Sequence, residues 1–328
     1  MELVVEPLGL VLRASPGANL LETLRANNVP VSYSCLAGRC GTCRCKVIRG
    51  DILETGREAI NSDPLGANHV LACMSVLTES CTIEIPEPDE VITHPARILR
   101  ATVTCIEDMT HDIKRLRLRP SKPLSFSPGQ YSLLQFAPGM VRPYSMANLC
   151  TDSELEFDIR LVPNGRVTGY IAEQLKVGDT VRVTGPLGTA YLRSRHEGPM
   201  LCVAGGSGLA PVRSIVRGAL ERGMRNPIYL YHGVRTPADI YDLDALKALA
   251  ERHSNLHIDV VITSGNDRPA MRSGIVTEAV EQDHADLSGW RAYLCGAPPM
   301  VEAATLLAQR RGIAREHIYA DAFYASSS

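Results

Sequence analysis

The chain has 328 residues, enough for two or three domains that each bury a core of their own. Its formal net charge is −2 at pH 7, so the charge favours neither nucleic acid nor an anionic membrane as a partner. We find no apolar run of the ~18 residues that a spanning helix needs, and no basic and apolar leader at the start. We therefore expect a cytoplasmic protein that binds neither nucleic acid nor membrane.

Residues 1–90 form the first predicted domain, with a net charge of −5 against +3 for the remainder. Short strands are expected around one helix, which is indicated by the stripe of Leu20, Leu21 and Leu24. The proline-rich, acidic segment 86–90 is the best candidate for a linker.

Four of the ten cysteines form a pattern within this first domain. Cys35, Cys40, Cys43 and Cys73 are separated by four, two and 29 residues, which is the plant-type spacing for a 2Fe–2S cluster. Such a cluster needs three thiolates from one tight loop and a fourth from across it. Buried free thiols are one alternative, and zinc is another, although a four-cysteine zinc site usually has two Cys-x2-Cys knuckles.

Residues 96–197 form the second predicted domain, in which short strands follow one another with Pro and Gly between them. This pattern indicates a small antiparallel barrel with one helix after Gly165. The string Arg142-Pro143-Tyr144-Ser145 lies at the end of a barrel strand. Arginine can clamp a phosphate, tyrosine can stack on a flavin ring, and serine can hydrogen-bond a ring nitrogen; an ordinary polar loop is the alternative.

The beginning of the predicted helix supplies a second candidate group, made of Gly165, Val167 and Thr168. A glycine and a hydroxyl residue at a helix N-terminus suit a pyrophosphate. Thr168 could instead serve as a simple N-cap, and both roles can coexist.

Residues 198–328 form the third predicted domain, where apolar strands alternate with helices, as in a parallel doubly wound sheet. Gly205-Gly206-Ser207-Gly208 follows the first of these strands and opens a helix predicted to begin at Pro211. The position suits dinucleotide phosphates, although the spacing is not Gly-x-Gly-x-x-Gly. Cys295 and Gly296 sit between a later strand and helix, at the edge where such sheets bind ligands, and a packed thiol is the alternative for Cys295.

Taken together and in this order, these motifs resemble the ferredoxin–NADP reductase superfamily fused behind a plant-type ferredoxin. Within it, the chain resembles the reductase components of naphthalene- and nitroarene-type Rieske aromatic-ring dioxygenases. The similarity covers essentially the whole chain and includes Ser32-Tyr33-Ser34-Cys35, the segment 185–192 and Asp321-Ala322-Phe323-Tyr324. It implies a β-grasp ferredoxin domain, an antiparallel flavin barrel and a doubly wound nicotinamide-binding domain.

The resemblance also implies roles for individual residues. FAD would be held by Arg142, Pro143, Tyr144 and Ser145, with Gly165, Val167 and Thr168 at its pyrophosphate. NADH or NADPH would be held by Gly205, Gly206, Ser207, Gly208, Pro211, Arg235, Cys295 and Gly296. Ser145, Cys295 and Phe323 would act at the reacting rings, with Phe323 covering the flavin. Many relatives end on that aromatic residue, whereas five residues follow Phe323 here.

The implied function is electron transfer from NADH through FAD to the cluster, and on to a Rieske-type ferredoxin and a terminal oxygenase. The flavin is needed because nicotinamide gives up two electrons at once and the cluster accepts one. Arg235 could accept a 2′-phosphate, so we expect NADH with some tolerance of NADPH, and a monomeric reductase. The alternatives are the reductase of a diiron monooxygenase or of a deoxysugar pathway, and a ferredoxin-like redox sensor with a vestigial flavin module.

Overall fold

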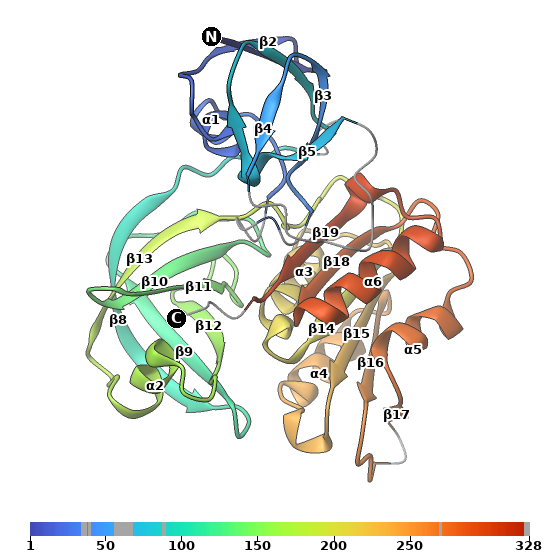
Figure 1. Cartoon of the computed structure of the whole chain (residues 1–328). Coiled ribbons are helices and arrows are strands. Elements are labelled where there is room, and N and C mark those ends of the chain that lie inside the picture. Colours follow the sequence, from blue (N-terminus) through green and yellow to red (C-terminus); the bar gives the residue numbers. More distant parts are fainter. Residues whose placement is uncertain (34–37, 39–40, 56–67, 87–89, 269–270, 325–328) are drawn as a thin grey trace. The chain divides into compact units, whose positions relative to one another are not determined.

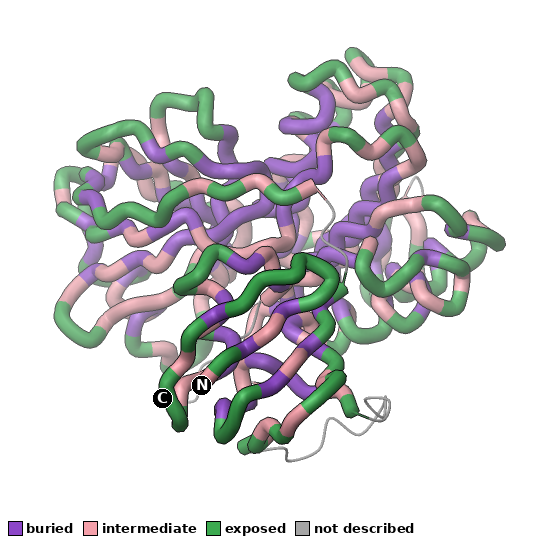
Figure 2. The backbone as a smooth tube through the Cα atoms, turned by 90° about the horizontal axis from the view of Figure 1, so that it is seen from above, coloured by how far each residue is buried: buried purple, intermediate pink, exposed green. Residues whose placement is uncertain are grey.

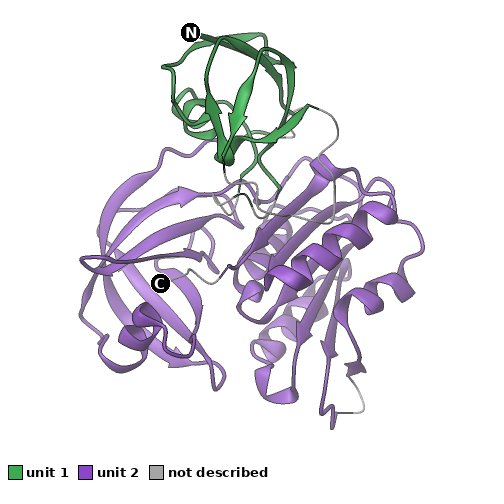
Figure 3. Ribbon diagram, viewed as in Figure 1, with its two compact units in different colours: residues 1–91 green, residues 92–328 purple. Residues whose placement is uncertain are grey.

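The computed structural model describes residues 1–328 except 34–37, 39–40, 56–67, 87–89, 269–270 and 325–328. The chain divides into two compact units, residues 1–91 and 92–328 (Figure 3). The linker expected at 86–90 lies largely outside the described residues. No helix in the described ranges is long and apolar enough to cross a membrane.

The first unit is a mixed sheet that packs on one helix. The sheet has the order β2-β1-β7-β3-β5, with β1 and β7 parallel and the other pairs antiparallel. Its strands are β1 (Glu2–Glu6), β2 (Leu10–Arg13), β3 (Arg44–Arg49), β5 (His69–Leu71) and β7 (Cys81–Glu84). A small second sheet pairs β4 (Ile52–Glu54) with β6 (Ser75–Leu77), and a 3-10 turn, η1 (Ala72–Met74), links β5 to β6. This is the expected β-grasp arrangement.

Helix α1 (Leu20–Ala26) follows from its local sequence. Asn19 caps it, because the side chain accepts a hydrogen bond from the Glu22 amide at 3.1 Å. The predicted leucine stripe is buried against the sheet, with exposed fractions of 0–2%. The helix ends before Asn28, whose φ of 56° lies in the left-handed region.

The second unit begins with the antiparallel barrel, whose strand order is β11-β10-β13-β8-β9-β12 (Figure 1). The strands are β8 (Arg97–Asp108), β9 (Ile113–Pro120), β10 (Tyr131–Ala137), β11 (Met140–Ser145), β12 (Leu155–Arg160) and β13 (Thr180–Leu187). Helix α2 (Arg166–Glu173) packs its buried Val167 and Ile171 on the barrel core. The two end strands of this sheet, β11 and β12, approach each other. The Ala147 amide, just after β11, donates to the Glu156 carbonyl in β12 at 2.8 Å.

The remainder of the second unit is a parallel sheet of order β17-β16-β15-β14-β18-β19. Its strands are β14 (Met200–Gly205), β15 (Ile228–Val234), β16 (Leu256–Ile262), β17 (Arg272–Ser273), β18 (Arg291–Gly296) and β19 (Ile318–Ala322). Its helices are α3 (Leu209–Glu221), α4 (Leu243–Arg252), α5 (Val276–Asp283) and α6 (Pro298–Arg310), with the 3-10 turns η2 (Gly206–Gly208), η3 (Pro237–Asp239) and η4 (Arg315–His317).

Helices cover both faces of this sheet. The core on one face takes side chains from α3 and α4, and the core on the other takes them from α5 and α6 (Figure 1). Figure 2 marks the buried residues of the chain in purple. The strand order reverses between β14 and β18, so the crevice at their carboxyl ends is the switch point where such sheets bind ligands.

One predicted boundary was wrong. Helix α3 begins at Leu209, two residues before the expected Pro211. Pro211 therefore lies inside the first turn, where its missing N–H costs no hydrogen bond.

Candidate functional site

Two glycine loops meet at the switch point of the parallel sheet. The first, Gly205 to Gly208, follows β14, and the second, at Gly296, ends β18. A Cβ placed on Gly208 would lie 2.1 Å from the Cys295 carbonyl oxygen, and one on Gly296 would lie 2.8 Å from the Gly205 carbonyl oxygen. Only glycine lets these two backbones touch, and the result is a backbone-lined cradle that suits a dinucleotide phosphate.

The remaining residues predicted for the nicotinamide lie around these loops. Ser207 is buried within the glycine turn, whose Gly206 has a φ of 54°. Arg235 is exposed just after β15, at the carboxyl edge of the sheet. The structure thus brings the predicted nicotinamide residues to one edge.

A hydrogen bond joins the barrel to the parallel sheet at the same edge. The Ser145 hydroxyl, at the end of β11, donates to Asp321 Oδ2 in β19 at 3.1 Å. Asp321 is the register partner of Cys295 on the neighbouring strand β18. Three side chains from three strands therefore converge where a flavin held by the barrel would meet a nicotinamide held by the sheet.

Cys295 is fully buried, with an exposed fraction of 0%. Burial, and next the Asp321 carboxylate, hold the pKa of its thiol well above the usual range. The side chain is therefore a neutral thiol and cannot act as a thiolate nucleophile.

The barrel side of the site is built on β11 and α2. Arg142 and Tyr144 alternate with Pro143 and Ser145 along β11, so the first two share one face of the strand. Tyr144 packs edge-on against Phe136, with ring centroids 6.5 Å apart, and its burial raises the pKa of its hydroxyl. Within the described part of the chain Arg142 has no carboxylate partner, which leaves its guanidinium available to a phosphate.

Helix α2 begins at Arg166, and its N-cap is Gly165. Thr168 is therefore not the N-cap that one prediction suggested; its hydroxyl lies within hydrogen-bonding distance of the Val162 amide at 3.2 Å and of the Gly165 carbonyl at 3.3 Å. Thr168 is the third residue of the helix and lies beside the buried Val167. Its hydroxyl contacts therefore link the preceding loop to the first turn of the helix. Arg142 and this helix start together supply a cation and backbone amides, the donor set that suits the pyrophosphate of FAD.

The cysteine site is described in part, because Cys35 and Cys40 lie outside the described residues. Cys43 is buried and Cys73 is half-buried. The Gly38 amide donates to Cys73 Sγ at 3.3 Å, and the Cys73 amide donates to Cys43 Sγ at 3.4 Å. Amides directed at sulfur stabilise thiolates, so these donors fit a 2Fe–2S cluster.

Two glycines beside these sulfurs have a left-handed backbone. Gly38 and Gly41 have φ values of 70° and 68°. Cys45, two residues past Cys43, is a packed thiol: it is buried, and burial raises the pKa of its thiol to about 12.

Phe323 follows β19 and is half-buried. Its amide donates to the Gly296 carbonyl at 2.8 Å, which places its backbone beside the second glycine loop. Ala322 and Tyr324 join the core beneath α6, and Phe323 does not belong to it.

Two residues at the site were not singled out from the sequence. One is Asp321, whose only local signal is its place two residues before Phe323. The other is Arg160, at the end of β12, which pairs with Asp112 at 2.7 Å. A Cβ built on Gly206 would lie 2.9 Å from its guanidinium, so Arg160 extends from the barrel to the glycine turn.

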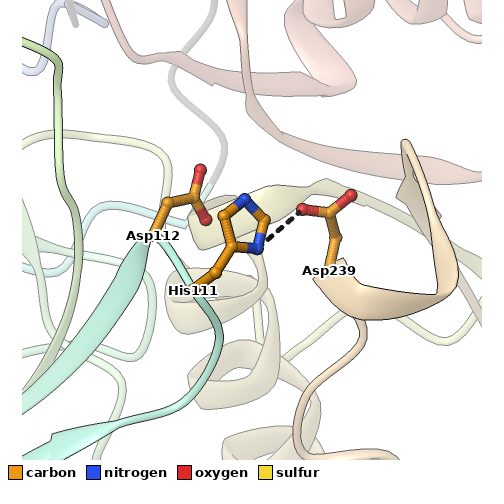
Figure 4. A group of neighbouring side chains, drawn as sticks. All are labelled: His111, Asp112 and Asp239. Atoms are coloured by element: carbon orange, nitrogen blue, oxygen red, sulfur yellow. Dashed lines mark ion pairs between the residues drawn. The ribbon is translucent and has the colours of Figure 1, made fainter.

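His111 and Asp112 also face Asp239 at the edge between barrel and sheet (Figure 4). His111 Nδ1 lies 3.9 Å from Asp239 Oδ1. Both carboxylates are already engaged, Asp112 by Arg160 and Asp239 by the Thr236 amide at 2.8 Å. We therefore assign no metal to this group.

Comparison with known proteins matches each part of the chain. Family models match a 2Fe–2S iron–sulfur cluster binding domain at residues 3–78, an oxidoreductase FAD-binding domain at 100–191 and an oxidoreductase NAD-binding domain at 202–305. The chain is 60% identical over 326 residues, 99% of both chains, to the ferredoxin–NAD(P)+ reductase component of the naphthalene 1,2-dioxygenase/salicylate 5-hydroxylase systems of a Ralstonia species. The chain belongs to this family of reductase components.

Other members of the reductase-component family are also similar over their whole length. The reductase component of the naphthalene 1,2-dioxygenase system of Pseudomonas putida is 56% identical, over 99% of both chains. A crystal structure of an Amycolatopsis cytochrome P450 reductase is 34% identical with a TM-score of 0.78, over 98% of both chains. The protein is thus an electron-transferring oxidoreductase with 2Fe–2S, FAD and NAD binding domains, and the zinc and vestigial-flavin alternatives are set aside.

Proposed function

We propose that this reductase carries electrons from NADH through FAD and its 2Fe–2S cluster to a Rieske-type ferredoxin that serves an aromatic-ring dioxygenase. The observation that carries the NADH-to-flavin step is the 3.1 Å hydrogen bond from Ser145 to Asp321, which joins the barrel to the sheet beside Cys295. The 60% and 56% identities to reductases of naphthalene dioxygenase systems support the choice of partner. A phenol 2-monooxygenase reductase from a Pseudomonas strain is 34% identical, so the monooxygenase alternative has weaker support.

When bound, the flavin supplies the exchange between two-electron hydride chemistry and one-electron transfer. The work of the chain is to bind, orient and shield. Arg142 and the first turn of α2, at Gly165, Val167 and Thr168, would hold the FAD phosphates. Tyr144 would pack along the ring system, with Pro143 fixing the strand between them.

At the sheet, the glycine loops would hold the dinucleotide. Gly205, Gly206, Ser207, Gly208 and Gly296 present backbone to it, and Pro211 stiffens the first turn of α3. Arg235 would lie toward the adenosine end and tolerate a 2′-phosphate.

Ser145 and Asp321 control a proton at the junction. The Ser145 Oγ–H is held by Asp321 Oδ2, so the serine oxygen keeps its lone pairs for a donor on the bound flavin. A proton received by the serine oxygen would be matched by passage of the Oγ–H proton to Asp321 Oδ2, so that Ser145 would stay neutral. Cys295, buried and neutral, would form an apolar floor beneath the nicotinamide, and Phe323 would cover the flavin until the nicotinamide arrives.

The remaining assignments complete the proposal. Cys35, Cys40, Cys43 and Cys73 would hold the cluster, and the domains would be residues 1–90, 96–197 and 198–328. We propose a monomer that acts in the cytoplasm; gel filtration of the purified protein tests the first statement.

The test of the function is a spectrum and two assays. The purified protein should be yellow-brown, should reduce ferricyanide and cytochrome c with NADH, and should reduce a Rieske ferredoxin from a naphthalene dioxygenase system. A colourless protein, or one inert toward NADH, would overturn the proposal. Reduction of a diiron monooxygenase in preference to the Rieske ferredoxin would favour the alternative partner.

A further inference from the structure

The barrel and the parallel sheet meet along helix α3. Its Ser214 hydroxyl donates to the Asn148 carbonyl of the barrel at 2.7 Å, and both residues are buried. A Cβ on Gly218 would lie 2.5 Å from Pro128 of the barrel, so the helix packs too closely there to admit a side chain. Because α3 starts at the glycine turn, any shift of this contact moves the turn relative to the barrel.

A network of six charged side chains crosses this contact. Arg115 donates two hydrogen bonds to Asp242, at 3.0 and 2.6 Å, and two to Asp158, at 2.8 and 3.1 Å. Arg213 of α3 binds Asp242 at 2.5 Å and also Glu156, which in turn accepts from Arg117 at 2.9 Å. Barrel strands β9 and β12 supply four of the six charges, and the parallel-sheet part supplies Asp242 and Arg213.

The centre of the network is buried, Arg117 at its end is 38% exposed, and the charges alternate. The side chains of Arg115, Asp158 and Asp242 are 5%, 0% and 7% exposed. Burial opposes ionisation, but Arg213 and Arg115 outweigh it and lower the pKa of Glu156, while hydrogen bonding from Arg115 lowers that of Asp242. The carboxyl groups of Glu156 and Asp242 are therefore held in their charged form.

A buried ionic network contributes little to stability, but it can fix the alignment of the two parts that it joins. Desolvation offsets most of the attraction, whereas a displacement that separates Arg115 from Asp242 leaves a buried charge without its partner. An unpaired charge in a dry interface is costly. The network thus permits one alignment of barrel and sheet and penalises its neighbours.

Asp242 connects this alignment to the site. It has a left-handed backbone, with φ 56°, which is uncommon outside glycine but is tolerated by aspartate and asparagine. Its neighbour Tyr241 donates to the Gly206 carbonyl in the glycine turn at 3.3 Å. Asp242, whose carboxylate Arg115 binds, is therefore the chain neighbour of a residue that contacts the nicotinamide cradle directly.

We propose that Asp242, gripped by Arg115 and Arg213, is a positioning residue that sets the flavin barrel against the nicotinamide cradle for hydride transfer. This inference rests on the proposed NADH-to-flavin function. The network is expected to set the geometry of hydride transfer and not the affinity for the dinucleotide, because none of its members lies in the glycine loops.

The test compares Asp242→Asn with Asp152→Asn. Asparagine tolerates the left-handed backbone and keeps the shape of aspartate, so the first variant removes only the charge. Asp152 is a matched control, because it pairs with Arg217 of α3 across the same contact at 3.1 Å, but both side chains are about one-third exposed (34% and 32%). Flavin content, NADH dissociation constant and limiting rate of flavin reduction are measured by stopped-flow, and amide hydrogen exchange is measured over 113–120 and 209–221.

We expect Asp242→Asn to reduce the limiting rate about 10- to 100-fold, as misplacement by a fraction of an ångström to one ångström does. NADH affinity should stay within about twofold, because the binding loops are intact. Exchange should accelerate in both segments, and Asp152→Asn should match the wild type because exposed pairs contribute little.

A limiting rate within about twofold of the wild type in Asp242→Asn would overturn the inference, as would an equal loss in the control. Should Asp242→Asn lose its flavin, Arg213→Lys decides, since lysine keeps the charge but not the two-armed contact. That variant should lose at least about threefold in rate with flavin retained, and wild-type behaviour there refutes the proposal. Failure of the wild type itself to be reduced by NADH would instead refute the proposed function.

Discussion

Replacing Gly208 with alanine tests the contact between the two glycine loops. The ordinary contact distance of 3.4 Å exceeds the 2.1 Å from a Cβ on Gly208 to the Cys295 carbonyl oxygen by about 1.3 Å. Gly208 has a helical backbone, with φ −61° and ψ −12°, so alanine is conformationally acceptable and the effect is purely steric. The neighbour is backbone, which cannot rotate away as a side chain can, so the loops must separate.

Separation of the two glycine loops by about 1 Å would misplace the nicotinamide, and this should slow hydride transfer about 100-fold. The assay is stopped-flow reduction of the flavin over a series of NADH concentrations, with flavin content and a melting curve as checks on folding. Overpacking of this kind should also destabilise the protein by about 1–3 kcal/mol.

Gly169→Ala is the matched control. Gly169 lies in helix α2, and a Cβ there would have no neighbour within 4 Å. Alanine should stabilise the helix by about 0.5–1 kcal/mol and leave the rate of flavin reduction unchanged. Wild-type NADH affinity and rate in Gly208→Ala would refute the reasoning, since the loops would then not form the cradle.

Three further predictions concern the other parts of the chain. Phe323→Ala should tighten binding of the oxidised nicotinamide, seen as a charge-transfer band, and increase electron leakage to dioxygen; a loss of about 3–5 kcal/mol with unchanged affinity would instead show a core residue. Cys73→Ser should remove the iron centre and abolish cytochrome c reduction while NADH-dependent ferricyanide reduction survives, because the cluster belongs to another unit than the flavin; simultaneous loss of both activities in a folded protein would contradict the modular assignment. Burial, offset only in part by Gly206, Asp242 and Asp239, lowers the pKa of His232 from 6.5 to about 4. Below pH 6.5 the unfolded chain binds the proton first, so stability should fall by about 3 kcal/mol between pH 6.5 and 4, and denaturant unfolding of His232→Gln should show a flatter profile over that window.

Sequence patterns alone predicted those parts of the protein whose chemistry is local. The cysteine spacing indicated a cluster because three of its ligands must come from one loop. The glycine turns at Gly205 and Gly296 were readable because each lies directly between a strand and a helix. Strand and helix patterns predicted the antiparallel barrel and the doubly wound sheet, since burial of one face imposes a period within each element, whereas the β-grasp fold was implied by the family resemblance.

The side-chain contacts between barrel and sheet, in contrast, follow only from the tertiary packing of the two folds. Ser145 and Asp321 are 176 residues apart, and Arg115 and Asp242 are 127 apart. No local period marks such pairs, because the benefit of each charge exists only once the two folds are packed together. Thr168 was misjudged as a possible N-cap for a related reason. Its hydroxyl had several local partners available, and the path of the preceding loop chose among them.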